Sequence, residues 1–241
     1  MTIGVYGLGR FGSFWASQLS TRFEVLAGTR DPARRTPPGV RRVELTELGR
    51  ADAVFLCVAI SALEPALEQL LPHLDDGTTV LDTCSVKKYP IEVMRRVVPE
   101  PIELVGTHPM FGPDSARDGM QGLPLILSEA RASSETYSRW HQEFTALGLR
   151  VVEMAADQHD HEAAYTQGVT HVIGRVLKEM QLNESLIGTL GYRKILEVIE
   201  QTCNDPYQLF LDLQRYNPYT VEMRDRLMHS ITKVVRDLSD Y

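Results

Sequence analysis

The stretch TIGVYGLGRFG (residues 2–12) decides the fold, because a glycine pattern directly follows a short apolar run. Residues 2–6 have the composition of a buried β-strand, and GLGRFG then has the spacing G-x-G-x-x-G. In such a loop Gly7 permits a tight turn, Gly9 lets a pyrophosphate approach the backbone, and Gly12 lets the next helix pack closely on the strand. The pyrophosphate would lie on the free N–H groups at the start of that helix. We therefore predict a dinucleotide-binding loop, lined also by Leu8, Arg10 and Phe11.

Seven further short apolar runs follow this strand, and amphipathic helical patterns lie between several of them. Strands that alternate with helices are typical of βαβ units in a parallel sheet whose two faces are both covered. The sequence therefore predicts an α/β fold with a doubly wound, mostly parallel sheet. The further predicted strands comprise residues 23–27, 40–43, 53–58, 79–82, 102–107, 123–127 and 149–154.

The character of the sequence changes near Ala155, where strand patterns stop and long helical patterns begin. We place a domain boundary there, between a dinucleotide-binding domain (1–154) and an all-helical domain (155–241). A helical domain of this length has a thin core, so we expect it to pack against its twin in a homodimer. The alternative is a monomer whose helices fold back on the sheet. The last helical pattern has one apolar face, formed by Leu227, Met228, Ile231, Val234, Val235 and Leu238.

Composition excludes several classes of partner and site. The net charge of −7 argues against nucleic acid or an acidic membrane surface, because neither is attracted to an acidic body. The three cysteines are widely spaced and lack metal-ligand spacing, so we expect neither a disulfide framework nor a zinc site. His159 and His161 lie two residues apart on a predicted helix, and we expect both to be solvated. Because the first strand begins at Thr2, we expect no targeting peptide and a cytoplasmic location.

The end of the second predicted strand distinguishes between nicotinamide cofactors. An NAD site usually has Asp or Glu there, about 20 residues after the glycines, to bind the ribose 2′-hydroxyl. In the segment EVLAGTRD this position is Thr29, and Arg30 follows it. A carboxylate would repel a 2′-phosphate, whereas a hydroxyl beside a guanidinium would bind one. We therefore predict NADP as the cofactor, with Val58 also at its site. The alternative, a solvated basic surface, is more credible for Arg34 and Arg35 than for Arg30.

Two polar segments follow predicted strands at the sheet edge where open α/β sheets bind ligands. They are DTCSVK (82–87) and GTHPMFGPDS (106–115), and together they would bring Ser85 and His108 near the nicotinamide. A serine hydroxyl can orient an imidazole, which can then take a proton from a substrate hydroxyl. We therefore predict catalytic roles for both residues.

At these segments the sequence resembles the prephenate/arogenate dehydrogenase family of tyrosine biosynthesis, particularly its short arogenate-type members. The resemblance extends nearly end to end and implies a Rossmann domain followed by a helical dimerisation domain. THPMFGP and the T-H-x-x-G-R-V-L helix are more specific to the family than the glycine loop is. The matching segments are the glycine loop, D-x-x-S-V-K, THPMFGPDS, QGVTHVIGRVL (167–177) and LGYRKILEVIEQTCNDPYQLF (190–210), continuing into RYNP (215–218).

The resemblance implies oxidative decarboxylation of a cyclohexadienol, in which ring carbon C4 gives a hydride to the nicotinamide and C1 loses carbon dioxide. Aromatisation drives this reaction, so the protein has mainly to orient the ring and help to withdraw the 4-hydroxyl proton. The resemblance makes His108 the acceptor of that proton and Ser85 its partner. It also implies that His171 binds a substrate carboxylate, beside Gln167 and Thr189. The alternative for His171 is a structural histidine at a domain interface.

The resemblance further implies which cyclohexadienol is preferred. Prephenate carries a keto group where arogenate carries an ammonium, so a site that distinguishes them needs an anion there. The matching segment QTCNDPYQLF makes Asp205 that anion and implies arogenate as the substrate. The alternative is that Asp205 only caps a helix beginning at Pro206.

One position departs from the family pattern. Many prephenate-type members have an arginine after the G-[FY] turn that binds the substrate carboxylate, and here Glu197 lies near the expected place. Arg193 and Arg215 are possible substitutes, although each is equally consistent with a surface charge.

Two other functions remain open at this point. A related β-hydroxyacid dehydrogenase or imine reductase usually has a catalytic lysine in its helical half, where this chain has only Lys178, Lys194 and Lys233. A redox-sensing module that binds NADP(H) without turnover would not need His108 and Ser85.

Overall fold

A computed structural model describes residues 1–239. The chain divides into two compact units, Met1–His159 and Asp160–Tyr241. We predicted the boundary just after the last strand, between Met154 and Ala155. The division falls slightly later, within helix α6 (Ala156–Ala163), because the first part of this helix belongs to the first unit. The last two residues of the predicted helical domain (155–241) lie outside the described residues.

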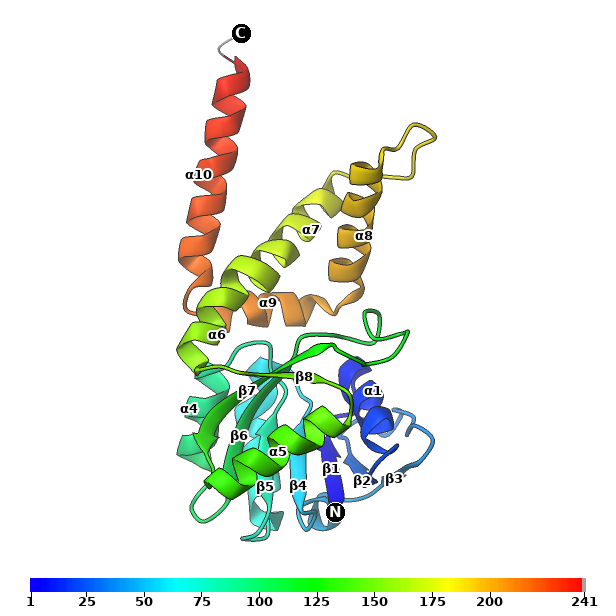
Figure 1. Cartoon of the computed structure of the whole chain (residues 1–241), viewed down its shortest axis with the longest axis vertical. Helices are drawn as coiled ribbons and strands as arrows, with labels where there is room; N and C mark the ends of the chain where they lie inside the picture. Colours follow the sequence, from blue (N-terminus) through cyan, green and yellow to red (C-terminus); the bar gives the residue numbers. More distant parts are fainter. Residues whose placement is uncertain (240–241) are drawn as a thin grey trace. The chain divides into compact units, whose positions relative to one another are not determined.

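Residues 1–159 form an eight-stranded sheet with the strand order β3-β2-β1-β4-β5-β6-β7-β8 (Figure 1). Neighbouring strands are parallel, except that β6 and β7 are antiparallel. The strand order reverses between β1 and β4, so the predicted doubly wound α/β fold is confirmed. The strands are β1 (Thr2–Tyr6), β2 (Glu24–Gly28), β3 (Val40–Arg42), β4 (Ala53–Leu56), β5 (Thr79–Asp82), β6 (Glu103–Pro109), β7 (Pro124–Arg131) and β8 (Arg150–Glu153).

Helices cover both faces of this sheet. Phe55 of β4 packs against Trp15 of α1 and Trp140 of α5, with ring centroids 5.8 and 5.3 Å apart. Successive side chains of a strand point to opposite faces of the sheet. The strand residues that point away from α1 and α5 therefore face α2, α3 and α4 on the other side. The Tyr6 hydroxyl, for example, donates a hydrogen bond to Gln69 Oε1 of α3 (3.1 Å). The helices of this unit before α6 are α1 (Arg10–Leu19), α2 (Leu45–Leu48), α3 (Leu63–Leu70), α4 (Lys88–Val97) and α5 (Ser134–Ala146).

The second unit consists of helices. Helix α7 (Val169–Glu179) packs so closely on α8 (Leu190–Asn204) that a Cβ at Gly174 would lie 2.1 Å from Thr202 Oγ1. A π-helical segment, residues Ala164–Gly168, connects α6 to α7, and such widened turns are frequent at functional sites. Helices α9 (Tyr207–Tyr216) and α10 (Thr220–Ser239) complete the unit.

The predicted apolar face of the last helix lies on α10 and is exposed in the single chain. Five of its six residues expose between 44% and 74% of their surface, and monomers rarely leave such a row uncovered. These residues are Met228, Ile231, Val234, Val235 and Leu238. Among the helices of residues 1–239, none combines the length and apolar character that crossing a bilayer requires.

Candidate active site

The glycine loop turns between the end of β1 and the start of α1. Gly7 has a φ of +110°, and a Cβ there would lie 2.4 Å from the carbonyl oxygen of Cys57. A Cβ at Gly12 would lie 1.8 Å from the carbonyl oxygen of Gly7. Both contacts are too short for any side chain, so the backbone itself requires glycine at these two positions. Val58 borders the same turn, since its Cγ1 would lie 3.1 Å from a Cβ on Gly7.

Gly9, the N-cap of α1, is different, because a Cβ there would meet no described atom within 4 Å. The space at Gly9 is open, and the N–H groups of the first turn of α1 have no carbonyl partner within the helix. A pyrophosphate fits this position, since these donors and the helix dipole both favour an anion. The Leu8 side chain lies in the core, so Leu8 reaches a ligand through its backbone, and Phe11 is partly buried against the same core. Arg10 forms an ion pair with Asp114.

The end of β2 lies next to this loop, because the Gly7 N–H donates to the carbonyl of Gly28 (2.9 Å). Thr29 follows at once, and its Oγ1 accepts a hydrogen bond from the N–H of Asp31 (3.3 Å). Arg30 is exposed and forms no ion pair with a carboxylate of residues 1–239. By contrast, Arg42 donates to three backbone carbonyls of residues 31–34 and so supports the turn. Arg30 is therefore a cation available to a ligand here, directly after the end of β2.

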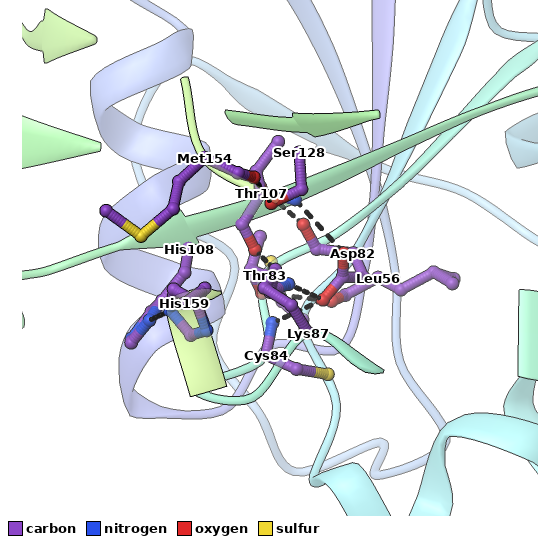
Figure 2. Close-up of polar contacts among 11 residues, drawn as sticks. Leu56, Asp82, Thr83, Cys84, Lys87, Thr107, His108, Ser128, Met154 and His159 are labelled. Carbon is purple, nitrogen blue, oxygen red and sulfur yellow. Dashed lines mark hydrogen bonds and ion pairs between the residues drawn. The ribbon is translucent and has the colours of Figure 1, made fainter. Parts of the chain in front are cut away.

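A buried ion pair connects the segment after β5 to β6 (Figure 2). Lys87 and Asp82 are fully buried, and the Lys87 ammonium bonds the Asp82 carboxylate and the Thr107 carbonyl. The same carboxylate accepts hydrogen bonds from the N–H groups of Cys84 (2.9 Å) and Thr107 (3.1 Å). The next residue along β6 is His108. The charge pair thus fixes the backbone that carries both predicted catalytic residues. Burial also raises the pKa of the Cys84 thiol well above its ordinary value, so this thiol stays protonated.

His108 is buried in β6, and its Nδ1 is hydrogen-bonded to Nε2 of His159 on α6 (2.9 Å; Figure 2). The prediction that His159 is solvated is therefore wrong: its exposed fraction is 2%. The two histidines of α6 do lie on different faces, but only His161 points to solvent. Desolvation lowers the pKa of His108 well below its ordinary value, and His159 and then Lys87 lower it further. The imidazole is accordingly neutral near pH 7.

Ser85 is also buried, with 5% of its surface exposed. We predicted that its hydroxyl orients His108, but the structure pairs the His108 ring with His159 instead. The Ser85 Oγ has no hydrogen-bond partner among residues 1–239. A buried hydroxyl without a partner is costly, so this one is available to a polar group of a ligand. His159 is the residue that sequence reasoning missed, and its only sequence signal was a helix position one turn after the last strand.

In the second unit, Gln167 and His171 lie four residues apart, in the π-helical segment and in α7. Gln167 Oε1 and His171 Nδ1 are both buried and have no hydrogen-bond partner among the described residues. Burial lowers the pKa of His171 to about 4, with a smaller contribution from Arg175. His171 is thus neutral at pH 7 and would meet a carboxylate as a hydrogen-bond donor. Two such orphaned polar atoms one helical turn apart indicate a polar ligand.

Asp205 and Thr189 lie at the two ends of α8. Thr189 is its N-cap, and its hydroxyl oxygen accepts a hydrogen bond from the Tyr192 N–H (3.2 Å). Asp205 is its C-cap, and α9 begins at Tyr207 with Pro206 as an N-cap that makes no side-chain hydrogen bond. Asp205 thus stands in the two-residue turn between α8 and α9.

Arg175 supports the turn that carries Asp205. The sequence did not reveal this role of Arg175. Its Nη2 donates to the carbonyl oxygens of Thr202 (3.1 Å) and Asp205 (2.9 Å). Its guanidinium carbon lies 5.3 Å from the ring centroid of Tyr207 and 5.7 Å from that of Phe210. One planar side chain thus connects α7 to the end of α8 and the start of α9.

The two arginines proposed as substitutes for the family's carboxylate-binding arginine, Arg193 and Arg215, are both exposed. Glu197 is paired with Lys194 (2.7 Å). Arg193 is exposed and borders an open hollow that Glu197 and Glu200 also line, and Arg215 is exposed on α9. The helical lysines that a related reductase would use, Lys178, Lys194 and Lys233, are all exposed. Within residues 1–239 no group of three or more His, Cys, Asp or Glu side chains is arranged to hold a metal ion.

The sequence of this chain is similar to known protein families and to curated proteins. Residues 30–140 match the family described as "Prephenate dehydrogenase, nucleotide-binding domain", and residues 176–241 match "TYRAAT1-like, C-terminal domain". The chain is 34% identical over 193 residues to "Arogenate dehydrogenase 2, chloroplastic" of Arabidopsis thaliana. The matched region covers 78% of this chain and 54% of the plant protein. The chain spans about half or less of the length of three curated relatives that it matches.

Two solved structures have the same fold. Arogenate dehydrogenase from Synechocystis superposes with a TM-score of 0.71 at 20% identity, covering 100% of this chain and 92% of the other. Prephenate dehydrogenase from A. aeolicus, in complex with hydroxyphenyl propionate and NAD+, superposes with a TM-score of 0.75 at 14% identity. The match again covers 100% of this chain and 92% of the other.

Proposed function

Because the chain belongs to the prephenate/arogenate dehydrogenase family, we propose that it catalyses the NADP-dependent oxidative decarboxylation of arogenate to tyrosine. Prephenate is the alternative substrate and would give 4-hydroxyphenylpyruvate. When bound, the nicotinamide ring accepts the hydride that leaves ring carbon C4. The observation that carries the proposal is the state of His108, a buried and neutral imidazole whose only hydrogen bond within residues 1–239 uses Nδ1.

His108 takes the 4-hydroxyl proton in this proposal. The Nε2 atom of its ring remains for the substrate, and its lowered pKa keeps it unprotonated at neutral pH. The unpartnered hydroxyl of Ser85 contributes a hydrogen bond to the same ligand. Loss of carbon dioxide and aromatisation need no further acid or base from the protein.

Gln167 and His171 bind the substrate's polar groups through their unpartnered buried atoms. A neutral imidazole beside a carboxylate gains a favourable charge partner on protonation, so binding raises the His171 pKa from its value of about 4.

The direct test is an absorbance assay at the reduced-nicotinamide band with four combinations: arogenate or prephenate, each with NADP or NAD. Reduction with arogenate and NADP supports the proposal. No reduction with either cyclohexadienol would contradict it, and cofactor binding without turnover would favour the redox-sensing alternative.

The first prediction concerns the cofactor. Thr29 and the uncommitted Arg30 stand where a carboxylate would favour NAD, so we expect NADP to be preferred by at least about tenfold in kcat/KM, roughly one charge-assisted hydrogen bond. Arg30→Ala should reduce this preference without abolishing hydride transfer. Arg42→Ala is the matched control, because Arg42 is committed to backbone carbonyls and should alter stability rather than the ratio. Equal or better efficiency of the wild type with NAD would refute the prediction.

The second prediction concerns substrate choice. We expect the wild type to prefer arogenate, because the Asp205 carboxylate can pair with its ammonium, which prephenate lacks. Asp205→Asn should then move the ratio of kcat/KM values toward prephenate, as steady-state assays of both substrates would measure. A variant that unfolds more easily yet keeps the ratio would show that Asp205 serves only the α8–α9 turn.

The helical unit is proposed to form the homodimer through α10, whose exposed apolar face supports this. The cytoplasmic location and the absence of nucleic-acid and membrane partners stay predictions.

A further inference from the structure

The contact between His108 and His159 joins two buried imidazoles. Their Nδ1 and Nε2 atoms lie 2.9 Å apart, the rings are inclined by 72°, and the exposed fractions are 3% and 2%. Helix α6, which carries His159, also bears Asp157, whose carboxylate pairs with Lys88 at the start of α4 (2.6 Å). Both histidines, and the hydrogen bond between them, therefore lie within the first unit.

A hydrogen bond between two neutral imidazoles has one donor and one acceptor, so it selects tautomers. If His159 Nε2 accepts, His108 carries its proton on Nδ1 and presents a lone pair on Nε2. If His159 Nε2 donates, His108 carries its proton on Nε2 and cannot act as a base there. A residue that accepts a proton through Nε2 needs the first arrangement.

The surroundings of His108 keep its ring from holding an extra proton. Burial lowers the pKa of His108, and His159 and then Lys87 lower it further. The nearby carboxylate, Asp82, is committed to Lys87 and to two backbone N–H groups, and so offers His108 no counter-charge.

We propose that His159 is a positioning residue for His108, accepting its Nδ1–H and so holding the catalytic imidazole with its Nε2 lone pair toward the substrate. The catalytic meaning of this arrangement rests on the proposed function, whereas the tautomer itself does not. When His108 takes the substrate proton on Nε2, both of its nitrogens carry hydrogen. The bond to His159 keeps the same direction in that state, because Nδ1 of His108 is still the donor.

The experiment compares wild type with His159→Phe, which keeps a ring but removes the acceptor, and His159→Gln, whose amide oxygen can reach the position of Nε2. Histidine 15N NMR reports which ring nitrogens carry hydrogen, and a His108→Asn sample identifies the His108 signals among the seven histidines. We expect the Nδ1–H tautomer in the wild type and in His159→Gln, and its loss in His159→Phe. In turnover, His159→Phe should lose about 10- to 100-fold in kcat, the cost of a misaligned group, with cofactor affinity unchanged. His159→Gln should recover most of that loss.

His161→Gln, two residues along α6 and exposed, is the matched control and should leave both readouts unchanged. A wild-type His108 with hydrogen on Nε2 would overturn the proposal, as would a His159→Phe variant with unchanged tautomer and kcat. If His159→Phe does not fold, the wild-type spectrum and the His159→Gln kinetics still decide. Failure of the proposed function would look different, because turnover would then be absent in the wild type while the tautomer could still be read.

Discussion

Replacement of His108 by Asn is expected to lower kcat by about 10²–10⁴-fold while NADP still binds, the usual range for a lost acid–base group. The His108 imidazole is a neutral, buried base, and an asparagine amide cannot take a proton in its place. Steady-state kinetics with NADP-binding titrations would measure both effects. Ser85→Ala is the milder comparison, since it removes a hydrogen bond and leaves the base in place. Near-normal turnover of His108→Asn would return this residue to a structural role.

The lowered pKa of His108 also sets a pH dependence. The folded protein resists protonation of this ring, so kcat/KM should not fall at pH 6.5, the ordinary histidine pKa, but only at lower pH. The unfolded chain takes up that proton at about pH 6.5. Stability from the neutral ring is therefore present above that value and is lost as pH falls toward the folded-state pKa. An acid limb of kcat/KM at or above pH 6.5 would contradict this assignment.

Lys87→Met should lower the free energy of unfolding by about 3–5 kcal/mol, because it leaves the Asp82 carboxylate buried without its counter-charge. Both side chains are fully buried, so water cannot replace the lost ammonium. Chemical denaturation of wild type and variant measures the difference. Adding Asp82→Asn to Lys87→Met should recover part of the loss, since the double variant no longer buries a lone charge.

Lys88→Met is the matched control for this prediction. Lys88 is the neighbouring residue and pairs with Asp157, but these side chains expose 37% and 63% of their surface. An exposed pair of this kind contributes about 0–1 kcal/mol. Equal destabilisation by Lys87→Met and Lys88→Met would show that the buried pair has no special role.

The sequence predicted those features that depend on neighbouring residues. Each strand of the sheet was recognised to within a few residues, because buried parallel strands are short apolar runs separated by helical patterns. The glycine loop was recognised from its spacing: a Cβ at Gly12 would meet the carbonyl oxygen of Gly7, five residues earlier, so this contact lies within the motif. The roles of Ser85, His171, Gln167 and Asp205 came from family resemblance, and they stay predictions.

Tertiary structure alone decided which side chains meet. His108 and His159 are separated by 51 residues, and the spacing of His159 and His161 indicated two helix faces without showing which one is buried. The sequence also did not show that Lys87 is buried beside Asp82, or that Arg175 donates a hydrogen bond to the carbonyl of Asp205, because both contacts depend on how the elements pack. Local propensity and hydrophobic period fix the elements of this protein, whereas the partner of a polar side chain depends on how distant elements pack, and that packing is collective.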